Sequence, residues 1–429
     1  MTTLPPISLS EQDCTHLGAE YYESLSEAPH LVRRLAGKDE DDAFCFAIDK
    51  QEEAYKVQTS YYVGADWITK DIAIQVRPKV EDGKSSIDYI SMLVEALQQP
   101  EAALKMDGLV TVDFQAKPIR LEQKEDTLSP FLIAQFIMTL KSAIRKGLRK
   151  SYYLVTENLH SKVKGKILVE QNIQKNLLRR NFVDNVCRYQ EYGVNNEENK
   201  ILKKALALSS RMLLSYHGAL KTDSLRKIIA MLRPYFREVD DDFDLHRVES
   251  FSANPIFKDY FKALEYAILI IKRCSYGINK NATQTETTPP YWIDMSKLFE
   301  LYVYKRLREQ YSSDEIFYQP NIHGRYPDYL LKPKDCSEPY VIDAKYKTDY
   351  ANGFADHIDD IRQVSAYARM KGVYAKLGIS SPDKMIKCLI IYPKLSSPMK
   401  LDSKLPECTL ESSPTYYELY KLGVGLPIH

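Results

Sequence analysis

The sequence predicts a multidomain α+β protein with a β-rich N-terminal region, a mainly helical middle region and a C-terminal core of order αβββαβ. The first reason is length, because 429 residues exceed what one ordinary hydrophobic core organises. The second is periodicity, which changes along the chain from strand-like to helical and then mixes the two. We expect domains at residues 1–125, 126–274 and 291–429, with a linker or exposed loop at 275–290.

Short runs of β-branched and aromatic residues predict the strands of the N-terminal region. They lie at residues 44–48, 55–63 and 71–76, and Pro78 ends the last of them. Residues 87–97 have the apolar spacing of a helix. The region up to about residue 125 is therefore expected to be mostly sheet.

Helical spacing of apolar residues dominates the middle region. A Ser-Pro pair beginning at Ser129 opens the first predicted helix, over residues 129–150. Further helices are expected at residues 196–214, 222–232 and 254–274. Residues 275–290 lack periodicity and are rich in Asn, Thr and Pro, which is typical of a linker.

The C-terminal part alternates between helix and strand patterns. An amphipathic helix opens at Asp294, with Leu298, Phe299, Tyr302 and Val303 on one side. Strands are expected at residues 315–319, 328–331 and 340–345, a helix at about 356–371 and a buried strand at 387–392. These elements give the order αβββαβ.

Two carboxylates and a lysine are placed together by this pattern. Asp328 follows Pro327 at the start of one strand, and Asp343-Ala344-Lys345 ends the next. Since side chains alternate along a strand, Asp343 and Lys345 project to the same side. Carboxylates suit Mg²⁺, and a lysine can deprotonate or orient a metal-bound water. The alternative is a solvated ion pair on an edge strand.

The motif and the order of elements resemble the PD-(D/E)xK nuclease superfamily, the fold of many restriction endonucleases. The resemblance implies a Mg²⁺ site, with Mn²⁺ as a substitute, held by Asp328, Asp343, Glu300 and the backbone carbonyl of Ala344. It also implies a supporting pair on the second helix, Gln363 and Tyr367, which share a helix face at spacing i, i+4. The alternatives are a surface glutamate at position 300 and a chance Gln/Tyr pair.

Five further segments resemble, in their order along the chain, the McrC family, the nuclease subunit of modified-cytosine restriction systems. They lie at residues 75–80, 164–167, 181–192, 199–206 and 295–303. The resemblance implies a partner, a McrB-like AAA+ GTPase ring that reads modified double-stranded DNA and translocates it. It also implies that the N-terminal part, here residues 1–125, docks on the ring and stimulates GTP hydrolysis. For residues 199–206 the alternative is the start of an ordinary helix capped by Asn195 or Asn196.

With a formal net charge of +1, the chain as a whole lacks the excess of basic residues that is typical of nucleic-acid-binding proteins. Any DNA-binding surface must therefore be a local basic patch. Candidate contacts to DNA phosphates are the basic residues Arg145, Lys146, Arg149, Lys150, Lys164 and Lys166. The alternative is that these residues are solvated helix ends and turns.

Several sequence features are missing. No phosphate-binding loop is found, so we expect the chain to bind no nucleotide itself. The seven cysteines have no CxxC spacing, and the N-terminus does not read as a signal peptide. No apolar run reaches membrane-spanning length. These features predict a cytoplasmic protein with no membrane association.

The sequence therefore predicts a Mg²⁺-dependent DNA endonuclease subunit of a McrBC-like restriction system. Two alternatives remain open from the residues alone. One is a non-catalytic activator or scaffold of the ring, and the other is a stand-alone nuclease of the same fold that acts on RNA or repair intermediates. The intact set of Asp328, Asp343 and Lys345 favours catalysis over the scaffold.

Overall fold

The chain forms two compact units in a computed structural model. The first unit contains Met1–Thr127, Gly218–Lys221 and Gln284–His429, and the second contains Leu128–His217 and Thr222–Thr283. The structure describes residues 6–427 except for gaps at 27–28, 36–43, 52–53, 82–84, 97–98, 100–104, 107, 114, 122–127, 146, 216–222, 243–256, 279–285, 336–337, 349, 351–352, 355–356, 382, 395–403, 406–407 and 409.

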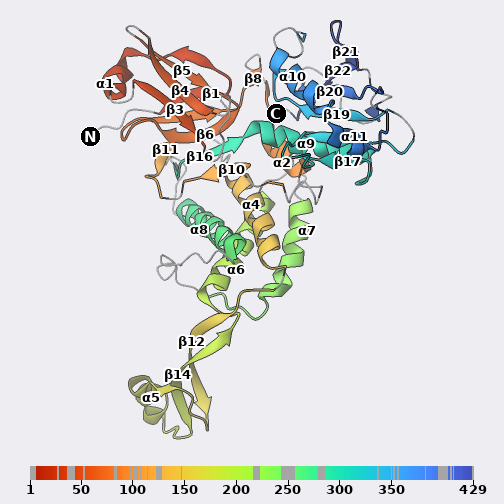
Figure 1. Cartoon of the computed structure of the whole chain (residues 1–429). Coiled ribbons are helices and arrows are strands. Elements are labelled where there is room, and N and C mark those ends of the chain that lie inside the picture. Colours follow the sequence, from red (N-terminus) through yellow and green to blue (C-terminus); the bar gives the residue numbers. More distant parts are fainter. Residues whose placement is uncertain are drawn as a thin grey trace. The chain divides into compact units, whose positions relative to one another are not determined.

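Two sheets form the N-terminal part of the first unit (Figure 1). One has the order β1 (Ile7–Ser10), β7 (Ala73–Arg77), β6 (Tyr62–Trp67), β16 (Tyr291–Asp294), β10 (Val110–Val112). The other has the order β2 (Cys14–His16), β5 (Ala54–Thr59), β4 (Phe44–Gln51), β3 (His30–Arg34). The strand predicted at 55–63 is thus two strands, because the chain passes from one sheet to the other at Ser60 and Tyr61. The helix predicted at 87–97 is α2 (Tyr89–Ala96).

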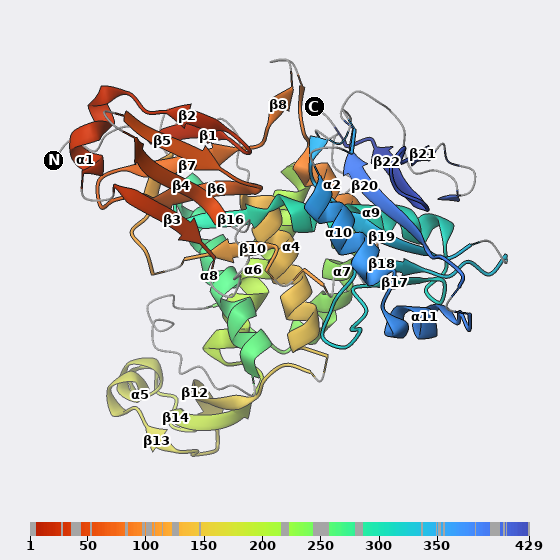
Figure 2. The ribbon, with the colours of Figure 1, turned by 45° about the horizontal axis from the view of Figure 1, so that its top comes forward.

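Strand β16 belongs to the N-terminal sheet although it lies far along the chain (Figure 2). It pairs antiparallel with both β6 and β10. Gly64 permits this pairing, because a Cβ at that position would lie 2.0 Å from the carbonyl oxygen of Tyr291. Trp292 is buried there, and its Nε1 donates to Asp66 Oδ2 at 3.1 Å. The domain boundary predicted at residue 291 therefore falls inside one compact unit.

The segment predicted as a linker, 275–290, also differs from the expectation. Helix α8 (Lys258–Ile278) extends into it. Residues 279–285 lie outside the described residues. Strand β15 (Glu286–Thr288) then pairs antiparallel with β11 (Ile119–Leu121). This pairing is non-local, so no periodicity within the segment could have revealed it.

The C-terminal part of the first unit contains a six-stranded sheet (Figure 1). Its order is β17 (Ile316–Tyr318), β18 (Tyr329–Leu331), β19 (Tyr340–Ala344), β20 (Lys387–Pro393), β22 (Leu419–Val424), β21 (Glu411–Ser412). The first three strands are antiparallel, whereas β19, β20 and β22 are parallel. Helix α9 (Met295–Gln310) precedes β17, and α10 (Ile358–Tyr367) lies between β19 and β20.

The predicted order αβββαβ is present as α9, β17, β18, β19, α10 and β20. The predicted helix at 356–371 is shorter, however, and a second helix follows, α11 (Lys371–Leu377). Met370 separates them, because its backbone is extended with φ −74° and ψ 126°. Strands β21 and β22 add to the far edge of the sheet and were not expected from the sequence.

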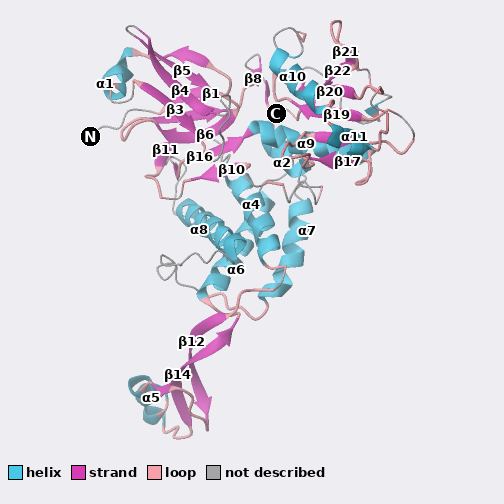
Figure 3. Cartoon of the chain, viewed as in Figure 1, coloured by secondary structure: helices cyan, strands magenta, loops and turns pink. Residues whose placement is uncertain are grey.

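The second unit combines helices with a long β-hairpin (Figure 3). Its helices include α4 (Leu128–Ala143), α6 (Glu197–Ser215), α7 (Asp223–Leu232) and α8. Strands β12 (Ser151–His160), β14 (Asp184–Gly193) and β13 (Lys166–Ile167) form a sheet that accompanies α5 (Val169–Lys175). The sequence predicted neither this hairpin nor the end of α4 at Ala143, seven residues before the expected end at Lys150. Among the described helices, none is long and apolar enough to cross a membrane.

Asn196 caps α6, as one alternative from the sequence predicted. Its Oδ1 accepts a hydrogen bond from the backbone N–H of Asn199 at 2.9 Å. The Asn199 side chain in turn donates to the carbonyls of Arg149 at 2.9 Å and Val194 at 2.7 Å. These contacts fasten the ends of the hairpin to α6, so packing accounts for the asparagines of this segment.

Glu11 supplies a pH-dependent contribution to stability. The carboxyl is buried in the first unit, and burial raises its pKa from 4.5 to about 7. The folded state therefore binds the Glu11 proton more tightly than the unfolded state, and this advantage is lost as pH rises from about 4.5 to about 7.

At pH 8 we expect the free energy of unfolding of Glu11→Gln to exceed that of wild type by on the order of 3 kcal/mol. The variant should therefore unfold at a higher temperature. The difference should shrink as pH falls towards 4.5, where both side chains are neutral. Thermal denaturation of both proteins across this range measures it. A difference that does not vary with pH would contradict the burial of an ionisable Glu11.

Candidate active site

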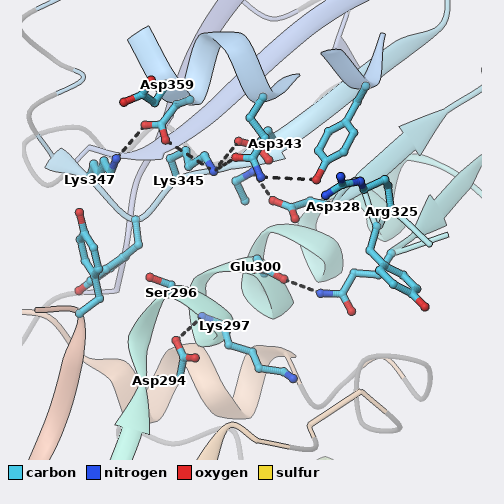
Figure 4. Close-up of a pocket in the computed structure, with 18 of the residues that line it drawn as sticks. Asp294, Ser296, Lys297, Glu300, Arg325, Asp328, Asp343, Lys345, Lys347 and Asp359 are labelled. Carbon is cyan, nitrogen blue, oxygen red and sulfur yellow. Dashed lines mark hydrogen bonds and ion pairs between the residues drawn. The ribbon is translucent and has the colours of Figure 1, made fainter. Parts of the chain in front are cut away.

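Asp328, Asp343 and Lys345 come together where β18 and β19 meet (Figure 4). Asp328 directly precedes β18, and the pairing of Tyr329 with Ile342 places it opposite Asp343 on β19. Asp328 Oδ2 accepts a hydrogen bond from the backbone N–H of Ala344 at 2.8 Å. Two carboxylates therefore lie on one face of neighbouring strands, as strand alternation predicts.

The lysine is held by partners from β19 and α10. Lys345 Nζ lies 3.0 Å from Asp343 Oδ2 and 3.7 Å from Asp360 Oδ1, and it donates to Gln363 Oε1 at 2.7 Å. Burial lowers the pKa of Lys345, but the charges of Asp343, Asp328 and Asp360 outweigh this effect and raise it above its usual value. The ammonium group is therefore charged in this environment.

Helix α10 contributes more to the site than the sequence indicated. Gln363 Nε2 donates to the Tyr367 hydroxyl at 3.4 Å, so both predicted residues of this helix lie at the site. Asp360 was not predicted. It lies three residues before Gln363, on the same helix face, and it also accepts from Lys347 Nζ at 2.9 Å and the Tyr350 hydroxyl at 2.8 Å. That spacing is the signal that could have found it.

Glu300 approaches the same cavity from α9, where Asp294 caps the helix by accepting from the Lys297 N–H at 2.9 Å. Glu300 Oε2 accepts from Gln319 Nε2 at 3.0 Å and from the Tyr318 hydroxyl at 3.3 Å. Burial raises the pKa of Glu300 to about 7, and the charges of Asp294 and Asp343 add to the shift. The predicted glutamate is thus a half-buried member of the acidic group.

Gln319 was also missing from the predicted set. Its backbone N–H donates to the carbonyl of Asp328 at 2.8 Å while its side chain holds Glu300. Its φ of 43° lies in the left-handed region, which is strained for a residue with a Cβ. Such strain gathers at functional sites, where surrounding contacts maintain it. Here those contacts link two acidic residues to the end of β17.

The acidic residues repel one another. Burial raises the pKa of Asp328 well above its usual value, and the charges of Glu300 and Asp343 raise it further. Among the described residues, no group of three or more His, Cys, Asp or Glu side chains is positioned to hold a metal ion as it stands. Even so, Asp343 Oδ2 is buried and, apart from its ion pair with Lys345, receives no hydrogen bond.

The donors nevertheless fit Mg²⁺. This ion binds protein through one or two carboxylates and completes its octahedron with water and substrate phosphates. Asp328 and Asp343 supply two such oxygen donors on one face. The roles of Glu300 and the Ala344 carbonyl as further ligands stay predictions.

A cavity of about 770 Å³ surrounds these groups. Its walls carry aromatic and basic side chains besides the acids, among them Tyr61, Tyr62, Lys297, Arg325, Tyr326 and Lys347. Arg325 and Tyr326 lie on the turn between β17 and β18 and are exposed. The cavity therefore offers cations around an acidic floor, which suits a phosphodiester next to a divalent ion.

The predicted DNA-contacting residues lie in the second unit. The Arg149 guanidinium forms an ion pair with Glu198, since it lies 2.6 Å from Glu198 Oε1. Lys164 Nζ lies 3.9 Å from the centre of the Tyr189 ring and 3.8 Å from Glu191. Arg145, Lys150 and Lys166 are exposed, and Lys146 lies outside the described residues. DNA contact through these residues, Arg149 included, stays a prediction.

The chain matches a known protein family. A family model described as McrBC 5-methylcytosine restriction system component matches residues 57–377. No curated protein matches.

Two solved assemblies from Thermococcus gammatolerans are similar at 17% identity. One is a half-complex from a tetradecameric assembly of McrB AAA+ hexamers with bound McrC, with 98% of this chain and 94% of that chain covered and a TM-score of 0.40. The other is the McrBC complex, with 70% and 87% covered and a TM-score of 0.29.

We expect Asp343→Asn to bind Mn²⁺ at least about ten-fold more weakly than wild type, because it loses a charged oxygen donor without changing shape. Calorimetric titration with Mn²⁺ measures this without any substrate. Asp314→Asn is the control, since Asp314 is an exposed carboxylate of the same unit that pairs with Lys334. Equal Mn²⁺ affinities for Asp343→Asn and wild type would remove Asp343 from the ligand set.

Proposed function

The chain belongs to the family of McrBC 5-methylcytosine restriction system components, and we propose that it is the Mg²⁺-dependent endonuclease subunit of such a system. The observation that carries the proposal is the convergence of Asp328, Asp343 and Lys345 at the end of two paired strands. The order of α9, β17, β18, β19, α10 and β20 around them supports a PD-(D/E)xK nuclease core.

Asp328 and Asp343 would hold the ion, with Glu300 and the Ala344 carbonyl as further donors. When bound, Mg²⁺ offsets the negative charge of the phosphodiester and acidifies a coordinated water. Lys345 is aimed by Gln363 and Asp343, so its ammonium donates to a phosphate oxygen or orients the attacking water. Because Lys345 remains charged beside three carboxylates, we favour this positioning role over that of a general base.

Arg325 supports phosphate binding at the mouth of the cavity. Its side chain is exposed and lines the cavity, and no ion pair for it is found among the described residues. The planar guanidinium of an arginine can donate two parallel hydrogen bonds to phosphate oxygens. Such a contact would position the DNA without reading its sequence. Contact with double-stranded DNA, modified or not, is part of this proposal.

A ring partner is the second part of the proposal. One of the solved assemblies contains McrB AAA+ hexamers with bound McrC, and we extend that association to this chain, with GTP as the nucleotide of the ring. The chain itself has no phosphate-binding loop, which supports a division between a motor and a cutting subunit.

The hairpin of the second unit, residues 151–193, is our candidate for the ring contact, and we call it the hairpin module. It exposes many large apolar side chains, including Tyr152, Leu154, Val163, Val169, Leu178, Phe182 and Tyr192. Leu178 and Phe182 are each 74% exposed. Clustered exposed apolar residues mark protein interfaces. We therefore prefer this module to residues 1–125, whose strands are built into the unit that holds the acidic site.

Asp343→Ala and Asp328→Ala should abolish DNA cleavage in the presence of Mg²⁺ and the ring partner, because each removes a ligand. Lys345→Ala should slow cleavage by roughly 10²–10⁴-fold, the usual loss for a proton-transfer or water-positioning group. Cleavage of modified duplex DNA on gels measures both effects. Asp314→Ala, which removes an exposed carboxylate of the same unit, should cut normally. Cutting at the wild-type rate by folded Asp343→Ala would exclude this site.

The two roles should separate by mutation. The isolated chain should hydrolyse no GTP but should accelerate hydrolysis by the ring, and Asp343→Ala should accelerate it equally well. Leu178→Ser combined with Phe182→Ser should abolish the acceleration, whereas Tyr417→Ser, an exposed aromatic outside the module, should not. Phosphate release measures GTP hydrolysis. Full stimulation by the double variant would remove the hairpin module from the ring contact.

A further inference from the structure

Tyr346 connects the site to the N-terminal sheets. It directly follows Lys345 and is 4% exposed. Its hydroxyl donates to Glu11 Oε1 at 3.0 Å, and its backbone carbonyl accepts from Gln12 Nε2 at 3.3 Å. Its ring lies 5.8 Å from the ring of Phe299 and 6.4 Å from that of Tyr61. Contacts from the N-terminal sheets, together with Phe299 of α9, thus surround this single residue.

The turn that carries Glu11 is itself rigidly held. The N–H of Glu11 donates to the carbonyl of Arg77 at the end of β7, and the N–H of Gln12 donates to that of Ser60, between β5 and β6. Glu11 Oε1 also accepts from the N–H of Lys79 at 3.1 Å. The turn is therefore fixed to both N-terminal sheets, and it moves only when they move.

The buried position of Glu11 is energetically unfavourable for the folded state. The carboxyl is buried, and its second oxygen, Oε2, has no hydrogen-bond partner. A buried unsatisfied acceptor destabilises the folded state. A group kept at such a cost, in contact with the neighbour of Lys345, points to a role in the site.

The backbone around Lys345 explains what that role is. Strand β19 ends at Ala344, after which the N–H of Lys345 donates to the carbonyl of Ile391 and the N–H of Lys347 donates to that of Lys345, both at 2.8 Å. The second of these bonds joins residues i and i+2, so it closes a γ-turn centred on Tyr346. Holding the Tyr346 ring in place therefore fixes this turn and, with it, the backbone from which the Lys345 side chain leaves.

We propose that Glu11 and Tyr346 form a clamp through which the N-terminal sheets position Lys345 for cleavage. This inference rests on the proposed nuclease function. Glu11 does not line the cavity, and the Tyr346 hydroxyl is directed to Glu11, so we assign both a positioning role. The N-terminal region is then a part of the nuclease, and a shift of its sheets changes the cleavage rate through the position of Lys345.

The test compares variants of the full chain, assayed with its ring partner. Tyr346→Phe removes the hydroxyl and keeps the ring, and Glu11→Leu removes the acceptor. Glu11→Gln keeps Oε1 as an acceptor for the Tyr346 hydroxyl. Tyr311→Phe is the matched control, because it removes another buried hydroxyl of the same unit, which accepts from the N–H of Leu405 at 2.8 Å.

We expect Tyr346→Phe and Glu11→Leu to lower kcat by about 10- to 100-fold, as a small misplacement of a catalytic group does, with an unchanged KM for DNA. Glu11→Gln and Tyr311→Phe should cut at nearly the wild-type rate. Wild-type kcat for Tyr346→Phe would overturn the clamp, and so would a loss in Glu11→Gln as large as that in Glu11→Leu.

Hydrogen exchange separates the clamp from the proposed function. Without DNA or metal, the amides of Lys345 and Lys347 should exchange faster in Tyr346→Phe than in Tyr311→Phe or wild type. If the wild-type protein cuts no DNA, the nuclease proposal fails while this measurement still decides the clamp. Equal exchange in the three proteins would overturn the clamp whatever the cleavage result.

Discussion

Charge crowding around the cavity is the constraint on which the site depends. Glu300, Asp328 and Asp343 come from one helix and two strands, and burial together with mutual repulsion raises the pKa values of the first two. Different donors hold each carboxylate in place: Gln319 for Glu300, the Ala344 N–H for Asp328 and Lys345 for Asp343. The arrangement remains unfavourable without a further cation, because repulsion and desolvation outweigh these contacts. A divalent ion and a phosphate would relieve it, so the proposed function would account for a group that costs stability.

The same constraint explains why the first unit is built from both ends of the sequence. Groups that repel must be held by a rigid frame, and one sheet edge offers little rigidity. Strand β16 supplies a second connection, because it pairs within the N-terminal sheet immediately before α9, the helix that carries Glu300. Gly64 allows the close approach on which that pairing depends. Tyr346 supplies another connection beyond β19. Helix α9, which carries Glu300, and strand β19, which carries Asp343, are thus both connected to the N-terminal sheets.

Local sequence patterns predicted part of the candidate site. Strand alternation placed Asp343 and Lys345 on one face, and helical spacing paired Gln363 with Tyr367, because both rules act over a few residues. Non-local contacts were not predictable. Nothing within residues 291–294 indicates that they complete a sheet with β6, and a buried Glu11 cannot be told from a surface glutamate without its partner. The hairpin module was missed for another reason: its apolar residues are largely exposed, so they do not produce the one-sided pattern that identifies a packed strand.

Two features of the chain are therefore unfavourable in isolation, and they belong to different units. The first unit holds a buried acidic group, and the second exposes apolar side chains on the hairpin module. In the proposed function a cation and a phosphodiester would relieve the first, and an apolar protein surface would relieve the second. The two features differ in chemistry and lie in different units, which agrees with the two partners that we propose. In the proposed assembly, a protein bound to the hairpin module would control cutting by delivering DNA or by shifting the N-terminal sheets that hold Tyr346.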